Sequence, residues 1–122
     1  MAKYQFVVFS EPKPGKDAGY NDWYTNRHVH DVVAVPGVTA AQRFERVDVG
    51  DEPPRLARFL ALYEMDTDDP KALLEELLTR SGGETMPLSD DIDLESTHFQ
   101  IYRVITERVT SGAKSETKQP AE

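Results

Sequence analysis

Turn and helix-stop signals divide this 122-residue chain into six segments, and the order of those segments constrains the fold more than any other feature. Runs rich in aromatic and β-branched residues predict strands over 4–9, 38–49, 55–65 and 96–106. Pro36-Gly37 ends a predicted helix over 18–34, and an aspartate followed by proline begins a leucine-striped helix over 71–79. The order is therefore strand, helix, strand, strand, helix, strand.

A β-α-β-β-α-β chain of this length predicts an α+β, ferredoxin-like domain, in which a four-stranded antiparallel sheet carries both helices on one face. We assign residues 1–109 to this single domain. Residues 110–122 are polar and lack large apolar side chains, which predicts a disordered tail. The stretch over 80–95 contains two glycines, a proline and an acidic run, so we expect a long loop there.

Apolar residues occur on both faces of the predicted strands. An antiparallel sheet with one face in water should alternate between apolar and polar side chains. In the first strand, however, Val7 and Phe9 oppose Phe6 and Val8, and the third strand repeats this pattern. We therefore expect the sheet faces to pair in a homodimer.

Composition excludes several classes of function. With 22 acidic and 14 basic residues the net charge is -8, and no Lys/Arg cluster is present, so neither a nucleic-acid nor a membrane partner is expected. The absence of cysteine excludes thiol chemistry and sulfur-ligated zinc. The amino terminus lacks the pattern of a secretory signal, which predicts a cytoplasmic protein. No nucleotide-binding or phosphate-binding motif occurs, so we expect no organic cofactor.

We expect the candidate active site to involve the first predicted helix, because this helix holds the only tryptophan and two of the three histidines. His28 could act as a general acid or base, oriented by Tyr24 at i-4 or Asp31 at i+3. The alternative is a buried structural histidine bonded to a tyrosine or a backbone carbonyl. Tyr24, His28 and Val32 form one row, which we expect to meet the sheet or a pocket. His30 lies roughly 160° from His28 on a regular helix, so the two cannot share a metal ion, and no metal site is predicted.

Two arginines fall on predicted strands, where a charge needs a partner or a polar cavity. They are Arg43 and Arg103. A structural partner would be Glu45, Glu64 or Asp31. A functional partner would be a substrate carboxylate or phenolate.

A pattern with fixed offsets runs from the first helix into the third strand. It consists of Trp23-Tyr24-x-x-x-His28-Val29-x-Asp31-Val32-x-x-x-Pro36-Gly37-Val38-x-x-Ala41-x-Arg43-Phe44, followed by Phe59-Leu60-Ala61-Leu62-Tyr63-Glu64. This pattern resembles the EthD-like branch of the dimeric α+β barrel superfamily. The resemblance implies a homodimer whose sheets face each other, a pocket between the sheet and the helices of each subunit, and a pocket-facing histidine at His28. The sequence departs from the family pattern at His30, where proline is common.

Relatives in this superfamily include cofactor-free isomerases, polyketide cyclases, dehydratases and small monooxygenases. The resemblance therefore implies a cofactor-independent isomerase, cyclase or lyase acting on a small apolar metabolite, aromatic or lactone-like in character. In this hypothesis His28 moves the proton, and Tyr24 and Tyr63 hydrogen-bond an oxygen. The predicted substrate-binding positions are Trp23, Phe6, Phe44, Arg43 and Asp31.

Plant cyclases of this superfamily pair a strand-borne histidine with a tyrosine. This likeness makes His98, with Tyr63 or Tyr102, a second candidate catalytic pair. Two other functions stay open at this point: a cofactor-free monooxygenase, and a non-catalytic protein that binds a hydrophobic small molecule.

Overall fold

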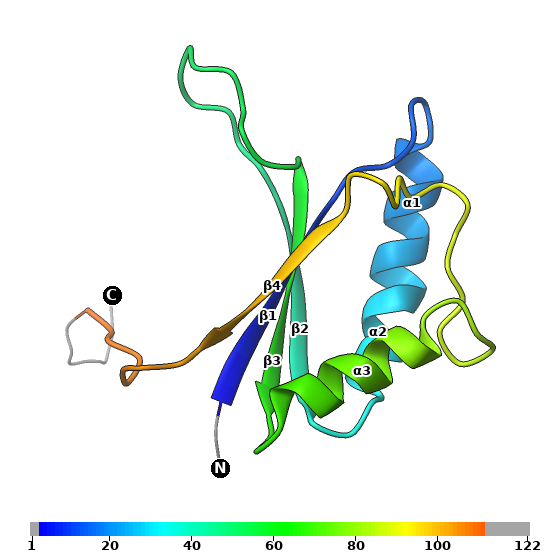
Figure 1. Cartoon of the computed structure of the whole chain (residues 1–122). Coiled ribbons are helices and arrows are strands. Elements are labelled where there is room, and N and C mark those ends of the chain that lie inside the picture. Colours follow the sequence, from blue (N-terminus) through cyan, green and yellow to red (C-terminus); the bar gives the residue numbers. More distant parts are fainter. Residues whose placement is uncertain (1–2, 112–122) are drawn as a thin grey trace.

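All helices of this protein lie on one face of a single sheet (Figure 1). The computed structural model describes residues 3–111, and the part of the predicted tail beyond residue 111 lies outside them. In chain order the elements are β1 (Lys3–Ser10), α1 (Asp17–Trp23), η1 (Tyr24–His28), α2 (Val29–Val33), β2 (Val38–Glu45), β3 (Phe59–Asp66), α3 (Pro70–Arg80) and β4 (His98–Arg103). This order confirms the predicted α+β arrangement.

The strands follow the order β2-β3-β1-β4, and every neighbouring pair is antiparallel. This is the sheet expected of a ferredoxin-like chain. Phe6 on the central strand β1 lies opposite Tyr63 of β3 and Ile101 of β4, so these three side chains share the face that the helices cover. We call this the inner face of the sheet, and the face without helices the outer face.

The first helix is continuous over the predicted range, but its middle is a π-helical turn. The backbone N–H of Val29 donates to the carbonyl of Tyr24, an i→i+5 hydrogen bond that places one extra residue in the turn. The wider turn keeps Tyr24, His28 and Val32 on one side of the helix, facing the sheet. The predicted row of Tyr24, His28 and Val32 therefore meets the cavity, as their i, i+4, i+8 spacing indicated.

The hairpin between β2 and β3 opens earlier than predicted. A last ladder bond joins Arg46 N to Arg58 O at 2.7 Å, and the strands then separate. The predicted strands over 38–49 and 55–65 are therefore shorter at their hairpin ends. Pro53 and Pro54 lie between them and cannot donate to a ladder. Residues 46–58, here called the arm, project beyond the sheet on the side away from the helices (Figure 1).

The last strand ends at Arg103 instead of residue 106. β4 is an edge strand whose one neighbour is β1, and Val104 N donates to Lys3 O at 3.0 Å near the start of that strand. With no further partner within residues 3–111, the segment 104–111 leaves the sheet. It projects from the sheet on the same side as the arm (Figure 1).

Helix α3 begins as the sequence predicts. Asp69 Oδ1 accepts a hydrogen bond from Ala72 N at 3.0 Å, and Pro70 occupies the first turn, where its missing N–H costs nothing. The stripe then buries Leu73 and Leu77 against the sheet. Burial of a leucine side chain contributes roughly 1.5–3 kcal/mol, so α3 is held by this stripe more than by its own backbone.

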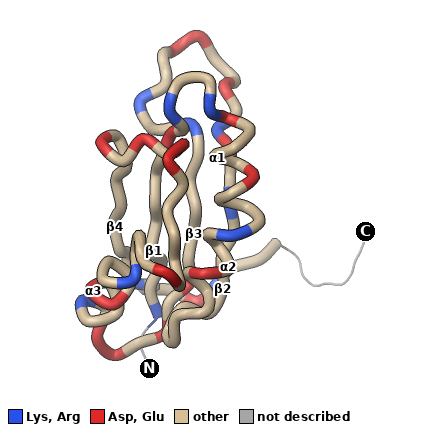
Figure 2. Tube along the Cα trace, turned by 90° about the vertical axis from the view of Figure 1, so that its right-hand side faces the viewer, with Lys and Arg blue, Asp and Glu red and all other residues tan. Residues whose placement is uncertain are grey.

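Acidic and basic residues alternate over the surface (Figure 2). Near the amino end of α1, for example, Arg58 lies 2.9 Å from Asp17 and 3.5 Å from Glu11. This interspersion leaves no continuous basic stripe along the described trace.

Within residues 3–111 no helix is long and apolar enough to cross a membrane.

Candidate functional site

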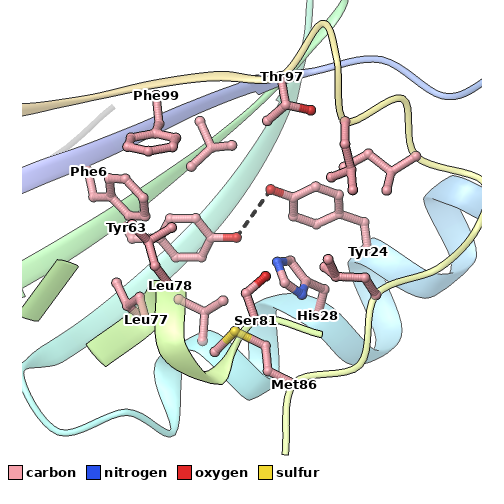
Figure 3. A pocket seen from close by; sticks show the side chains of 15 residues that line it. Phe6, Tyr24, His28, Tyr63, Leu77, Leu78, Ser81, Met86, Thr97 and Phe99 are labelled. Carbon is pink, nitrogen blue, oxygen red and sulfur yellow. Dashed lines mark hydrogen bonds between the residues drawn. The ribbon is translucent and has the colours of Figure 1, made fainter. Parts of the chain in front are cut away.

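A cavity of about 250 Å³ lies between the inner face of the sheet and the helices (Figure 3). Most of its surface is apolar. The residues that line it are Phe6, Val8, Tyr24, His28, Val32, Tyr63, Leu77, Leu78, Ser81, Met86, Leu88, Ile92, Leu94, Thr97 and Phe99. No Asp, Glu, Lys or Arg is among them.

One wall of the cavity is the connection between α3 and β4, residues 81–97, here called the strap. Six of the lining residues belong to it, although the sequence predicted only a long loop in this region. Backbone hydrogen bonds tie the strap to the β1–α1 loop, from Lys13 N to Asp91 O at 2.7 Å and from Asp93 N to Glu11 O at 2.9 Å. Trp23 Nε1 also donates to Pro87 O at 3.1 Å. These anchors give the cavity a defined wall.

Two buried tyrosines form the polar end of the cavity. Tyr24 is 2% exposed and Tyr63 is 1% exposed, and the hydroxyl of Tyr63 donates to the hydroxyl of Tyr24 at 3.3 Å (Figure 3). Burial raises the pKa of Tyr24 to about 12, and burial together with the neighbouring Tyr24 raises the pKa of Tyr63. Both phenols are therefore neutral at pH 7. Because Tyr63 uses its proton on Tyr24, the proton of Tyr24 is free to be donated to a ligand.

His28 lies beside this pair. Its ring stacks on Trp23 with centroids 4.6 Å apart, and meets the edge of the Tyr24 ring at 5.0 Å. Its Nδ1 is buried and has no hydrogen-bond partner within the described residues. Burial lowers the pKa of His28 to about 4, with Asp31 acting in the opposite direction. The imidazole is therefore neutral at pH 7 and is held by stacking, instead of by the tyrosine or carbonyl hydrogen bond of the structural alternative.

Arg43 lies behind the tyrosine pair. Its guanidinium carbon is 4.5 Å from the centroid of the Tyr24 ring and 5.4 Å from that of Tyr20, and Nη1 donates to Thr25 Oγ1 at 2.8 Å. No carboxylate in the described part of the chain forms an ion pair with it. Nε and Nη2 are buried without hydrogen-bond partners.

None of the carboxylates predicted to neutralise Arg43 does so. Asp31 binds Arg27 at 2.8 Å, Glu64 lies on the outer face, and Glu45 is exposed at the end of β2. The second strand arginine, Arg103, is exposed and needs no partner.

Four of the five predicted substrate-binding residues do not line the cavity: Trp23, Asp31, Arg43 and Phe44. Trp23 is not part of the lining and acts through its stacking on His28 and its hydrogen bond to the strap. Asp31 lies outside the lining, and its negative charge acts to raise the pKa of His28. Phe6, in contrast, lines the cavity as predicted.

The prediction that Phe44 walls this cavity is wrong. A β-bulge between Val38 and Ala40 adds one residue to β2, so the strand changes faces after the buried Val38. Arg43 consequently turns inward. Phe44 turns to the outer face and is 40% exposed.

The second candidate pair, His98 with Tyr63, does not assemble either. His98 lies opposite Phe9 on β1, which places it on the outer face, while its neighbour Phe99 points into the cavity. Because successive side chains of a strand alternate between faces, His98 and Tyr63 lie on opposite sides of the sheet. Tyr102 shares the outer face with His98. Over residues 3–111 no three His, Asp or Glu side chains come together as a metal site would require.

Several lining residues were not predicted from the sequence. They come from α3 and the strap, and the available signal was the recurrence of apolar residues in an otherwise polar loop: Met86, Leu88, Ile92 and Leu94. Such isolated apolar positions have no secondary-structure period. Their common direction depends on the hydrogen bonds that tie the strap to the β1–α1 loop.

The fold and cavity define a ferredoxin-like α+β domain with a small apolar pocket between its sheet and helices. No family model and no curated protein matches the sequence. Two solved structures share the fold. An EthD family protein from Bacillus halodurans is 13% identical, with a TM-score of 0.50 over 86% of this chain and 100% of its own. A provisionally named monooxygenase from Shewanella loihica is 14% identical, with a TM-score of 0.56 over 88% of this chain and 99% of its own. These similarities confirm the predicted fold and agree with the EthD-like resemblance of the sequence.

Proposed function

We propose that this chain is an EthD-like enzyme that binds a small, largely apolar compound in its cavity and moves a proton on it with His28. One observation carries the proposal: a neutral imidazole with an unpartnered, buried nitrogen lines the same apolar cavity as the hydrogen-bonded hydroxyls of Tyr24 and Tyr63. Buried polar atoms are normally satisfied, and exceptions require an explanation. A bound ligand would supply the missing partner.

The chemistry that fits is proton transfer next to a carbonyl or enol. His28 accepts a proton from carbon while the Tyr24 hydroxyl donates to the carbonyl oxygen, on which negative charge develops. Return of that proton to a different carbon isomerises the substrate, and all atoms are conserved. Two neutral phenols in series, Tyr63 donating to Tyr24, favour such an oxygen because each donor strengthens the next.

The shape and lining of the cavity support an aromatic or lactone-like substrate. About 250 Å³ is small for a ligand site, so one or two fused rings are a suitable size. Phe6 and Phe99 form one wall, with rings 5.6 Å apart in an edge-on arrangement, and offer flat contact to a ring. The absence of charged lining residues favours a compound that carries no fixed charge.

The test is exchange of carbon-bound protons in deuterated buffer. We expect the protein to accelerate deuterium incorporation next to the carbonyl of 2-tetralone or of 2-coumaranone, an aromatic lactone, followed by nuclear magnetic resonance. H28Q should reduce the exchange rate at least a hundredfold, the usual range for loss of a positioned base, and Y24F should reduce it less. H30Q is the matched control because His30 is exposed on the same helix, and it should exchange as the wild type does. Exchange by H28Q at the wild-type rate would contradict the assignment of His28.

A second candidate function is cofactor-free oxygenation of an electron-rich substrate. The observation that favours it is the name of the Shewanella loihica protein, a monooxygenase. The same base would first deprotonate a phenol or enol, and the electron-rich carbon of the resulting anion would reduce O2. One oxygen atom would become a carbonyl oxygen on that carbon in place of its two hydrogens, and the other would leave as water. Oxygen consumption in the presence of the bound ring compound distinguishes this reaction from isomerisation. Binding without either reaction would instead indicate a carrier of hydrophobic compounds.

The proposal includes a homodimer formed through the outer face. That face carries Val7, Phe9, Leu60 and Leu62, all only partly buried, and no helix covers it. The arm and the segment 104–111 both project on this side of the sheet (Figure 1). They hold the most exposed large apolar residues of the described chain: Val47, Val49, Leu56, Ile105 and Val109. A second copy seated on the outer face would cover the sheet and contact both projections.

Sedimentation velocity tests this pairing. The wild type should sediment as a dimer at micromolar concentration, and L62R should sediment as a folded monomer because it places a charge in the centre of the outer face. V33R is the matched control, since Val33 is an exposed apolar residue on the helical side. A monodisperse wild-type monomer, or an L62R dimer as stable as the wild type, would contradict the pairing.

A further inference from the structure

The buried part of Arg43 is unexplained by the packing of the fold. A cation taken out of water requires a charged or hydrogen-bonding partner to offset several kcal/mol of lost hydration. Arg43 is partly buried, and at its more exposed side Nη1 donates to Thr25 Oγ1. Its buried atoms Nε and Nη2 have no hydrogen-bond partner in the described chain, and no carboxylate there forms an ion pair with it. Its remaining contacts are with the faces of aromatic rings.

The guanidinium of Arg43 lies next to the cavity, behind the Tyr24 ring. The guanidinium lies 4.5 Å from the centre of the Tyr24 ring and is not part of the cavity lining, so the Tyr24 ring separates the charge from the space in which a ligand would lie. The groups around Tyr24 that can titrate are Tyr20 and His28 on its own helix and Tyr63 on β3. None of these is anionic at pH 7. Asp31, whose charge acts on the pKa of His28, is paired with Arg27.

We propose that the polar end of the cavity binds its ligand as an oxyanion, a phenolate or enolate whose oxygen accepts the Tyr24 proton while Arg43, a positioning residue behind that ring, supplies the compensating positive charge. This inference rests on the proposed function and adds the charge state of the bound compound. The negative charge of a developing anion would balance the positive charge of Arg43, which no carboxylate of the described chain does. Burial raises the pKa of Tyr20, Tyr24 and Tyr63, and Arg43 acts on each of them in the opposite direction, as a nearby cation does on a phenol.

A pair of ligands of nearly equal shape separates charge from packing. 4-Nitrophenol ionises near neutral pH to a coloured anion, whereas 4-nitroanisole carries a methyl group on the same oxygen and cannot ionise. Quenching of Trp23, the only tryptophan, reports binding because its ring stacks on His28 at the edge of the cavity. Between pH 6 and pH 8.5 neither His28 nor Tyr24 changes protonation, so a change in affinity over this range comes from the ligand.

The wild type should bind nitrophenol more tightly above the pKa of that ligand than below it. R43M should weaken binding of the anion about tenfold or more and should leave nitroanisole affinity within about twofold, while R43K, which keeps the charge, should stay near the wild type. Circular dichroism would confirm that each variant is folded. If R43M does not fold, the wild-type comparison of the two pH values decides alone.

Three results would overturn the inference: equal loss of both ligands in R43M, anion binding that R43M leaves unchanged, or wild-type protein that binds nitrophenol less tightly once it is ionised. Binding of nitroanisole together with rejection of the anion would refute the oxyanion site and leave the proposed pocket intact. Binding of neither compound would count against both proposals.

Discussion

Protonation of His28 should destabilise this protein at mildly acidic pH, because the folded state holds the imidazole in its neutral form. The pKa is lowered from 6.5 to about 4, chiefly by burial, so the unfolded chain binds a proton on this residue at a pH where the folded chain does not. Stability therefore falls as the pH falls from about 6.5 towards about 4, and no further loss from this group follows below that.

The magnitude follows from the two pKa values. The full shift corresponds to roughly 3 kcal/mol, and at pH 5.0 linkage gives a loss of roughly 2 kcal/mol relative to pH 7.5. H28Q removes the titrating group and keeps a polar side chain of similar reach. Between pH 7.5 and pH 5.0, the free energy of unfolding of H28Q should therefore fall by roughly 2 kcal/mol less than that of the wild type.

Urea denaturation at pH 7.5 and pH 5.0, at one fixed protein concentration, measures this difference. Carboxylates that titrate over the interval affect both proteins alike and cancel. H30Q controls for the loss of an imidazole from the same helix, and should show the pH dependence of the wild type. If the wild type and H28Q lose the same free energy of unfolding, the burial argument for His28 is refuted.

Three further substitutions test the local structure around the site. Gly37 has a φ of 104°, so G37A should lower the free energy of unfolding by about 1–2 kcal/mol, while G50A, where the added methyl meets nothing within 4 Å, should be nearly neutral in the same urea titration. W23F removes the donor to Pro87 and keeps an aromatic ring, so it should cost about 1 kcal/mol and speed amide hydrogen exchange in the strap; unchanged exchange would show that this bond does not hold the wall. D69A removes the α3 cap and should cost about 1 kcal/mol, with wild-type stability contradicting the role of that hydrogen bond.

Much of the fold follows from local signals in the sequence. Pro36-Gly37 and the Asp69-Pro70 pair each specify a backbone conformation by their own chemistry, so the helix end and the helix start were predicted from a few residues. The order of elements then leaves few topologies. The central site residues Tyr24, His28 and Tyr63 were also predicted, because a helical row and a buried strand must meet in such a fold.

The errors arise where a small irregularity changes the direction of a side chain. One extra residue in β2 exchanges the faces of Arg43 and Phe44, and nothing in the composition of that strand marks the bulge. In β4 both faces carry an aromatic residue, so the alternation of His98 and Phe99 does not reveal which face meets the helices. The π turn of the first helix is likewise invisible in a periodicity argument that assumes regular spacing.

The strap also has a consequence for how this protein could change over time. Six residues of the cavity wall belong to a segment that contributes no strand to the sheet, and a few hydrogen bonds to a neighbouring loop hold it in place. Lengthening or shortening of such a connection costs little folding free energy, because the entropy of loop closure depends weakly on length. The size and lining of the pocket can therefore be altered almost independently of the scaffold that carries Tyr24, His28 and Tyr63. Under the proposed function, one proton-transfer centre would in this way serve differently shaped compounds in different descendants of the same chain.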